Sequence, residues 1–108
     1  MSFNGNEGTM VASADAIAWT ASFRNSGQFA GIKGIFYGKN KIKTLINQSG
    51  AVGIRVYPGI DETGAPVMIL VGCDANENDI MGTNILERGS PCPPSCGGGG
   101  GVTNPLQG

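Results

Sequence analysis

The chain of 108 residues is long enough for one small domain and too short for two, and 40% of its residues are hydrophobic, which suffices for a core. A formal net charge of −1 argues against the overall basic field of a nucleic-acid-binding protein, so nucleic acid is not an expected partner. The absence of histidine removes the commonest general base and metal ligand, and we expect a protein that is not an enzyme and holds no cofactor.

The first predicted elements are an arm and a helix. Residues 1–9 are polar and rich in glycine and asparagine, which favours a flexible arm. In the helix that follows, Ser13 is the expected N-cap, Asp15 lies at the positive end of the helix dipole, and Gly27 is the expected left-handed C-cap. Apolar residues recur there with the i, i+3, i+4, i+7 spacing of a buried face, namely Ala14, Ile17, Ala18 and Ala21.

A short strand and a second helix are predicted next. Residues 32–37 are rich in β-favouring side chains, interrupted by Gly34, and indicate a strand. The second helix is expected to take Asn40 as its N-cap, to end at residues 48–50, and to point Lys41 and Lys43 outward. Its amphipathic spacing is set by Ile42, Leu45, Ile46 and Ser49.

The second half of the chain predicts a β-hairpin. The alternation from Val52 to Tyr57 is typical of a half-buried strand, and turn residues follow at Pro58–Gly59 and at Asp61–Gly64. The stretch Val67–Cys73 is apolar nearly throughout, which indicates a central strand or one covered on both faces. Residues 80–86 are expected to add a short edge strand.

The order α-β-α-β-β predicts an α+β fold, in which two short helices pack against a small, mostly antiparallel sheet. We expect three regions: the flexible arm at 1–9, the α+β domain at 10–88 and an irregular Gly/Pro/Cys-rich tail at 89–108. The tail contains a run of five glycines, and its composition does not favour burial in a core.

Four stretches carry a resemblance to a known group: residues 32–37, 53–57 and 70–79, and the closing Pro91-Cys-Pro-Pro-Ser-Cys96. Together they resemble small uncharacterised proteins of Bacteroidota that end in a Cys-Pro-Pro-x-Cys motif. The likeness covers roughly residues 10–97 and leaves out the glycine run and the last residues. It implies a domain boundary and no particular activity.

The cysteines allow three interpretations. Cys92 and Cys96 are four residues apart with two prolines between them, a spacing that suits a local disulfide under oxidising conditions. A zinc site would need two further ligands from Cys73, from carboxylates or from another subunit, and inert thiols are the third alternative. The spacing is not that of thioredoxin-like redox motifs. Cys73 itself is interpreted as a small buried residue of a strand.

Two polar patterns have both a functional and a structural interpretation. The pattern Asp74-x-Asn76-x-Asn78 matches the first ligand positions of a calcium loop, but Asp79 and Ile85 stand where that loop needs glycine and glutamate. A polar turn with side-chain-to-backbone hydrogen bonds is the interpretation we favour. The basic residues Lys33, Lys39, Lys41, Lys43 and Arg55 suit either a small nucleic-acid surface or an ordinary solvated face, and we favour the latter.

The uneven distribution of charge along the chain suits either a molecule with a basic side and an acidic side or an ordinary mixed, solvated surface, and we favour the latter. Six basic and no acidic residues lie between Asp15 and Asp61, whereas six acidic residues and one basic residue lie from Asp61 to Arg88. We expect a non-enzymatic interaction or self-assembly protein that forms a homo-oligomer or filament through its arm or tail. The expected assembly contacts are Ile80, Ile85, Leu86, Val102 and Leu106.

The alternative function is a small redox- or metal-linked module that uses Cys92 and Cys96. No small-molecule substrate is indicated by the sequence. Residues 1–7 lack the features of a signal peptide, and no apolar run reaches membrane-spanning length. A cytoplasmic protein without a membrane partner is therefore the default expectation, and an extracellular location would require another export route.

Overall fold

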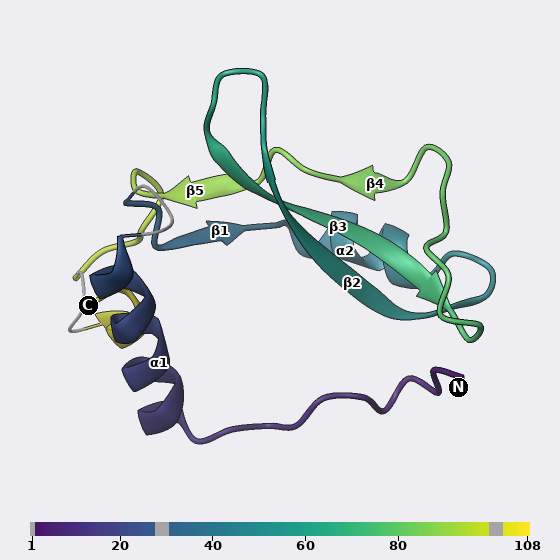
Figure 1. Ribbon diagram of the computed structural model, residues 1–108, viewed down its shortest axis with the longest axis horizontal. Helices are drawn as coiled ribbons and strands as arrows, with labels where there is room; N and C mark the ends of the chain where they lie inside the picture. The colour runs from purple at the N-terminus through teal and green to yellow at the C-terminus, as the bar shows by residue number, and fades with distance from the viewer. Residues whose placement is uncertain (1, 28–30, 100–102) are drawn as a thin grey trace. The chain divides into compact units, whose positions relative to one another are not determined.

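The computed structural model of the chain describes residues 2–27, 31–99 and 103–108 (Figure 1). The chain divides into two compact units. The first unit takes in residues 2–8 and 37–89, and the second takes in the described parts of residues 9–36 and 90–108. Helices and antiparallel sheets together confirm the predicted α+β class.

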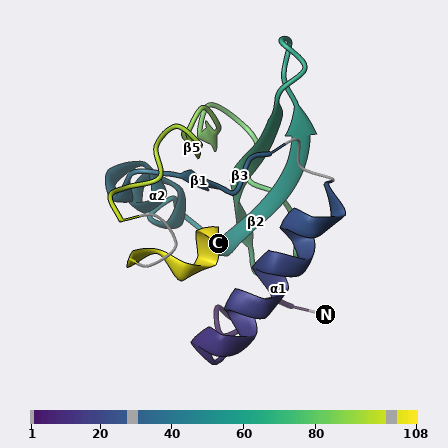
Figure 2. The ribbon, with the colours of Figure 1, turned by 90° about the vertical axis from the view of Figure 1, so that its left-hand side faces the viewer.

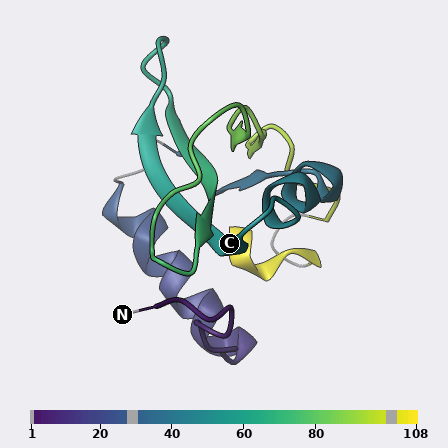
Figure 3. The same ribbon diagram turned by 90° about the vertical axis from the view of Figure 1, so that its right-hand side faces the viewer.

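The sheet of the first unit is antiparallel and has the order β2-β3-β4. Its strands are β2 (Ala51–Ile60), β3 (Pro66–Asp74) and β4 (Ile85–Leu86). In the centre of β3, Val71 pairs with Arg55 on one side and with Ile85 on the other. The prediction that the apolar strand is central is therefore confirmed. The turn end of the β2–β3 hairpin projects away from the rest of this unit (Figure 3).

The hairpin turn lies later in the chain than one of the two predicted positions. Pro58 and Gly59 belong to β2, where Pro58 pairs with Met68, so the turn predicted at these two residues is wrong. A proline is tolerated there because β2 is an edge strand, on which a missing N–H leaves no ladder bond unmade. The turn is made instead by Asp61, whose Oδ1 accepts hydrogen bonds from the N–H groups of Thr63 (2.8 Å) and Ala65 (3.0 Å). Gly64 completes it with a φ of +86°, as expected.

The helix α2 (Lys39–Ile46) contacts all three strands of this sheet. It begins after Gly38, not after the predicted N-cap Asn40. Leu45 is its one buried residue, only 2% exposed, and forms the core together with Val67, Leu70, Val71 and Cys73 of β3. Ile46, predicted for the buried face, is 44% exposed, because the helix ends at this residue and its side chain lies outside the core.

The second unit combines α1 (Ser13–Ser26), β1 (Gly34–Phe36), β5 (Ser90–Cys92) and a 3-10 helix, η1 (Pro105–Gln107). Strands β1 and β5 lie side by side (Figure 2) and run in opposite directions (Figure 1). In their register Gly34 lies opposite Cys92. Helices α1 and η1 contact each other, and Arg24 donates a hydrogen bond of 2.5 Å to the carbonyl oxygen of Leu106. The region expected to be an irregular tail thus contributes a strand and a short helix.

The helix α1 follows the prediction at its C-terminal end more closely than at its start. Gly27 adopts a φ of +70° and donates its N–H to Arg24, so the predicted C-cap is confirmed. The N-cap is Ala12, and the predicted Ser13 already lies inside the helix. No residue of α1 is buried, and Ala14 and Ala18 of the predicted face are exposed. A three-residue helix such as η1 is too small to cover a complete helical face.

Candidate functional site

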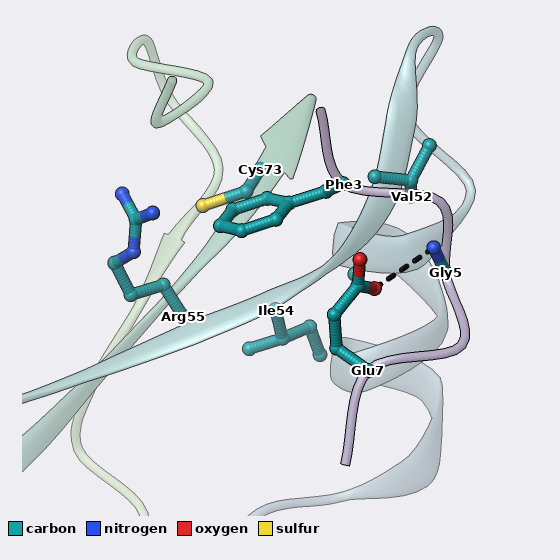
Figure 4. Close-up of a pocket in the computed structure, with 8 residues that line it drawn as sticks. Phe3, Gly5, Glu7, Val52, Ile54, Arg55 and Cys73 are labelled. Carbon is teal, nitrogen blue, oxygen red and sulfur yellow. Dashed lines mark hydrogen bonds between the residues drawn. The ribbon is translucent and has the colours of Figure 1, made fainter. Parts of the chain in front are cut away.

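The candidate site is a cleft between the N-terminal segment (residues 2–8) and the hairpin of the same unit (Figure 4). We call it the N-terminal cleft. It has a volume of about 220 Å³ and is lined by Phe3, Gly5 and Glu7 of the segment, by residues 52–55 of β2, and by Cys73 of β3. One wall of the cleft therefore consists of the segment that the sequence predicts to be an arm.

Phe3 makes the principal contacts of the N-terminal segment with the hairpin. It is the one described residue of the segment that is partly buried. Its N–H donates a hydrogen bond of 2.9 Å to the carbonyl oxygen of Ala75, and its ring centre lies 5.5 Å from the guanidinium carbon of Arg55. That distance suits a cation–π contact. In the close-up the Phe3 side chain extends from the segment toward β2 (Figure 4).

The rest of the segment is organised by its own residues. The carboxylate of Glu7 accepts hydrogen bonds from the N–H groups of Asn4 (2.9 Å) and Gly5 (3.0 Å), and these bonds hold its pKa below the usual value. Gly5 has a φ of +90°, and a Cβ atom there would lie 3.3 Å from the carbonyl oxygen of Val52. The segment therefore approaches β2 closely with a conformation that favours glycine.

A polar cluster around Asp79 lies next to the cleft and shares Arg55 and Cys73 with it. Oδ1 of Asp79 accepts hydrogen bonds from Arg55 (2.9 Å) and from the Cys73 thiol (3.1 Å). Oδ2 accepts a hydrogen bond of 2.7 Å from the Tyr57 hydroxyl. Arg55 also donates to the carbonyl oxygen of Glu77 at 3.3 Å. The cluster thus fixes the loop after β3 to strand β2.

The electrostatics of this cluster favour a structural role. The hydrogen bond from Tyr57, followed by the one from Cys73, lowers the pKa of Asp79, which stays ionised. Burial and the hydrogen bond to Asp79 raise the pKa of Cys73, so the sulfur stays a thiol and is a poor nucleophile. Cys73 is 2% exposed within β3, which confirms its interpretation as a small buried strand residue.

The sequence interpretation missed this cluster, although part of its signal was present. Arg55 and Tyr57 are two residues apart on a predicted strand, so their side chains had to lie on the same face. The position of Asp79 could not be predicted from the sequence, because it depends on an isolated bridge between Cys73 and Asp79 that forms after the chain has turned back.

The second pair of candidate residues lies in the other unit. Cys92 and Cys96 are placed at disulfide-bonding distance, with their Cα atoms 4.7 Å apart. Cys92 is 5% exposed, whereas Cys96 is half-buried. A second cavity, of about 490 Å³, borders both residues and also Phe36, Ser95 and Gln107.

The remaining polar patterns have ordinary surroundings. Oδ1 of Asp74 accepts hydrogen bonds from the N–H groups of Asn76 (2.9 Å) and Asn78 (3.0 Å), which confirms the interpretation as a polar turn. Within the described ranges no group of three or more Cys, Asp or Glu side chains is arranged to hold a metal ion. The lysines of α2 are exposed, and Arg55 is in the Asp79 cluster.

The expected assembly contacts are divided between the two units. Ile80, Ile85 and Leu86 belong to the first unit, where Ile85 is 40% exposed on the edge strand β4. Leu106 belongs to the second unit and is 46% exposed on η1. Val102 lies outside the described residues.

Comparisons with protein-family models, with curated proteins and with solved structures gave no match to this chain. The resemblance to small Bacteroidota proteins therefore stays a prediction. None of the helices in the described part of the chain is long and apolar enough to span a membrane.

Proposed function

We propose that the protein is a non-enzymatic self-assembly protein, in which the N-terminal segment of one copy docks on the hairpin of another and forms one wall of that copy's N-terminal cleft. The observation that supports this proposal is the docking of Phe3 against Arg55 and Ala75. The segment belongs to the first unit, whereas the residues that directly follow it, from Thr9 onward, belong to the second unit. A short terminal segment of this kind can exchange between identical copies.

Exchange requires no new complementary surface. A segment from a second copy would make the same hydrogen bond to Ala75 and the same contact with Arg55 as the protein's own segment. Such swapping of an identical element is a low-cost route to oligomers, because the incoming segment restores the interactions that the departing segment made. Reciprocal exchange between two copies closes a dimer, and exchange from each copy to the next produces a ring or filament.

The first experiment compares oligomeric state by size-exclusion chromatography with light scattering across a concentration series. We expect the wild-type protein to form oligomers, and we expect Phe3→Ala to shift the population toward monomer because it removes the ring contact with Arg55. Asn6→Ala is the matched control, since Asn6 is an exposed residue of the same segment and does not line the cleft. A wild-type protein that stays monomeric at the highest concentration would overturn the proposal.

A second experiment tests whether the segment is exchanged. Phe3 lines the same cleft as Arg55 and Cys73, so a photo-reactive p-azidophenylalanine at position 3 keeps the aromatic ring and cross-links to the hairpin on irradiation. An exchanged segment gives covalent dimers or longer ladders on a denaturing gel. A cross-linked monomer alone would show that each copy retains its own segment and would contradict the proposal. The same amino acid at the exposed position 6 is the control for non-specific cross-linking.

A further inference from the structure

The Cys92–Cys96 pair connects strand β5 to the end of the chain. Cys92 is the last residue of β5, is held opposite Gly34, and accepts a hydrogen bond of 2.6 Å at its carbonyl oxygen from the N–H of Lys33. Cys96 lies across the short ring that the disulfide closes. One end of the ring is thus fixed by the β1–β5 sheet.

The carbonyl oxygen of Cys96 is the acceptor for two side chains of the C-terminal segment (residues 103–108). Gln107 donates to it from Nε2 at 2.8 Å, and Asn104 donates from Nδ2 at 3.4 Å. On its other side the same segment is held to α1 by the bond from Arg24 to the carbonyl oxygen of Leu106. The position of Cys96 therefore helps to fix η1, because Gln107 and Asn104 are hydrogen-bonded to its carbonyl oxygen.

The two cysteine residues differ in exposure. Cys92 is only 5% exposed, whereas Cys96 is half-buried, and both border the open cavity of about 490 Å³. An incoming thiol reaches Cys96 with less obstruction than Cys92. Access is one of the factors that decide which sulfur of a disulfide is attacked.

We infer that Cys96 is the site of attack in a thiol–disulfide exchange, and that opening the Cys92–Cys96 ring releases the C-terminal segment from its contacts. The reactant is a dithiol. One of its thiolates attacks Sγ of Cys96, the bond between Cys96 and Cys92 breaks, and Cys92 leaves as a thiolate that takes a proton from water. The second thiol of the reactant then attacks the mixed disulfide, Cys96 leaves, and the reactant becomes a disulfide while the protein gains two electrons and two protons.

The release is confined by the hydrogen bonds that remain. After reduction, Cys92 is still held by its pairing with Gly34 and by the bond from Lys33. Cys96 donates its own N–H to Pro94 (3.0 Å), the neighbouring Ser95 donates to Pro91 (2.8 Å), and the bonds from Gln107 and Asn104 are no longer backed by a covalent link to β5. Strand β5 should therefore persist after reduction. Cys96, whose carbonyl oxygen accepts the bonds from Gln107 and Asn104, is then no longer bonded to Cys92 and can move with the C-terminal segment.

Amide hydrogen exchange of the full chain, oxidised or reduced with dithiothreitol, tests the release. We expect the N–H groups of Gln107 and Gly108 to exchange roughly tenfold faster after reduction, a size consistent with the loss of a small closed loop. The amides of β1 should keep their protection. Unchanged exchange at residues 107–108 would overturn the inference, and so would equal loss of protection throughout β1, because the release would then not be local.

Two variants separate the hydrogen bond from the redox step. Gln107→Ala should speed exchange at the C-terminal segment even in the oxidised protein, since it removes the donor to Cys96. Gln48→Ala is the matched control, because Gln48 donates a similar bond of 2.9 Å to the Leu45 carbonyl oxygen in the other unit. If Gln107→Ala leaves exchange at residue 108 unchanged, the contact does not hold the segment and the inference fails.

Peptide mass spectrometry identifies the attacked sulfur. A labelled monothiol, added in limiting amount and quenched with acid, is expected to appear on Cys96 in excess over Cys92. A label found mainly on Cys92 would contradict the assignment of Cys96. This measurement and the exchange experiments need no oligomer, so their outcome is independent of the proposed assembly.

Discussion

The two units of this chain are stabilised in different ways. The first unit holds nearly all of the buried apolar side chains, with Leu45 of α2 packed against β3. Among the described residues of the second unit only Cys92 is buried, and that unit depends on a disulfide, a short ladder and the bonds that join η1 to its neighbours. Burial of apolar area thus stabilises one unit, and covalent and polar links stabilise the other.

This difference predicts where single substitutions will act. A change in the first unit should cost free energy in proportion to the packing that it removes. A change in the second unit should act mainly through local conformation or through loss of a specific link. Amide hydrogen exchange read by peptide distinguishes the units, because it reports the stability of each segment separately.

The largest effect is expected from Leu45→Ala. Leu45 is 2% exposed, and truncating a buried leucine costs about 2–5 kcal/mol through lost burial and the cavity that remains. Chemical denaturation followed by hydrogen exchange should show this loss in β2 and β3. Ile46→Ala is the matched control, because Ile46 is the next residue of α2 and is 44% exposed, so its cost should be well under half as large. Equal costs for the two variants would contradict the assignment of the core.

The next largest effect is expected from Gly72→Ala. A Cβ atom at Gly72 would lie 2.8 Å from Nε2 of Gln48, the end of a flexible side chain that can move aside, and 3.1 Å from the carbonyl oxygen of Leu45, so the backbone of α2 would have to shift by a few tenths of an ångström. Overpacking of this kind costs about 1–3 kcal/mol. Gly53→Ala on the neighbouring strand is the control, since a Cβ there meets no atom within 4 Å. If both variants unfold at the same denaturant concentration, the close approach of α2 to β3 does not limit the packing.

The first unit was also the more predictable from sequence, for a physical reason. The apolar stretch of β3 and the turn residues Asp61 and Gly64 act locally, so the central strand and the hairpin turn could be recognised. Pro58 misled the prediction because a proline ends a central strand but is tolerated on an edge, and edge position is not visible in a single sequence. Sequence patterns predicted the structure correctly where neighbouring residues determine it, as in the Asp61–Gly64 turn, and failed where it depends on the place of a strand in the sheet, as at Pro58.

The second unit was harder to predict because its contacts are between segments that are distant in sequence. Nothing in residues 34–36 indicates that they pair with residues 90–92. The buried face expected for α1 assumed a broad apolar partner, and its observed neighbour η1 is only three residues long. The candidate site shows the same limit, because Asp79 joins Arg55 and Tyr57 only after the chain folds back.

A smaller effect is expected at the end of α1. Gly27 has a φ of +70°, so Gly27→Ala places a side chain in the left-handed region and should cost about 1 kcal/mol. The loss should be confined to faster hydrogen exchange in the last turn of α1. Gly34→Ala is the control in the same unit, since a Cβ there has no neighbour within 4 Å and its φ is not positive. Spread of the Gly27→Ala effect into β2 and β3 would show that the two units do not unfold separately.

Lowering the pH should destabilise the two units to different extents, because their content of acidic residues differs. Every acidic residue of the chain except Asp15 lies in the first unit. Four of these carboxyl groups have a lowered pKa, and in each the leading cause is a hydrogen bond that the carboxylate accepts. The donors are the N–H of Asn4 for Glu7, Thr63 for Asp61, Arg88 for Glu62 and Tyr57 for Asp79. A carboxyl whose pKa is depressed by folding stabilises the folded state above its unfolded pKa, near 4, and this contribution disappears as the pH falls through the lower folded pKa.

The first unit should therefore lose protection against hydrogen exchange as the pH falls below about 4, after correction for the intrinsic exchange rate, while the second unit changes less. Asp79→Asn should reduce this pH dependence in the loop that follows β3, because the neutral amide does not titrate. Tyr57→Phe should reduce it less, since it removes one donor and leaves those of Arg55 and Cys73 in place. A pH profile unaltered by Asp79→Asn would mean that the cluster does not couple this loop to β2. Equal loss of protection in both units at low pH would mean that the acidic residues do not make the first unit more sensitive to acid than the second.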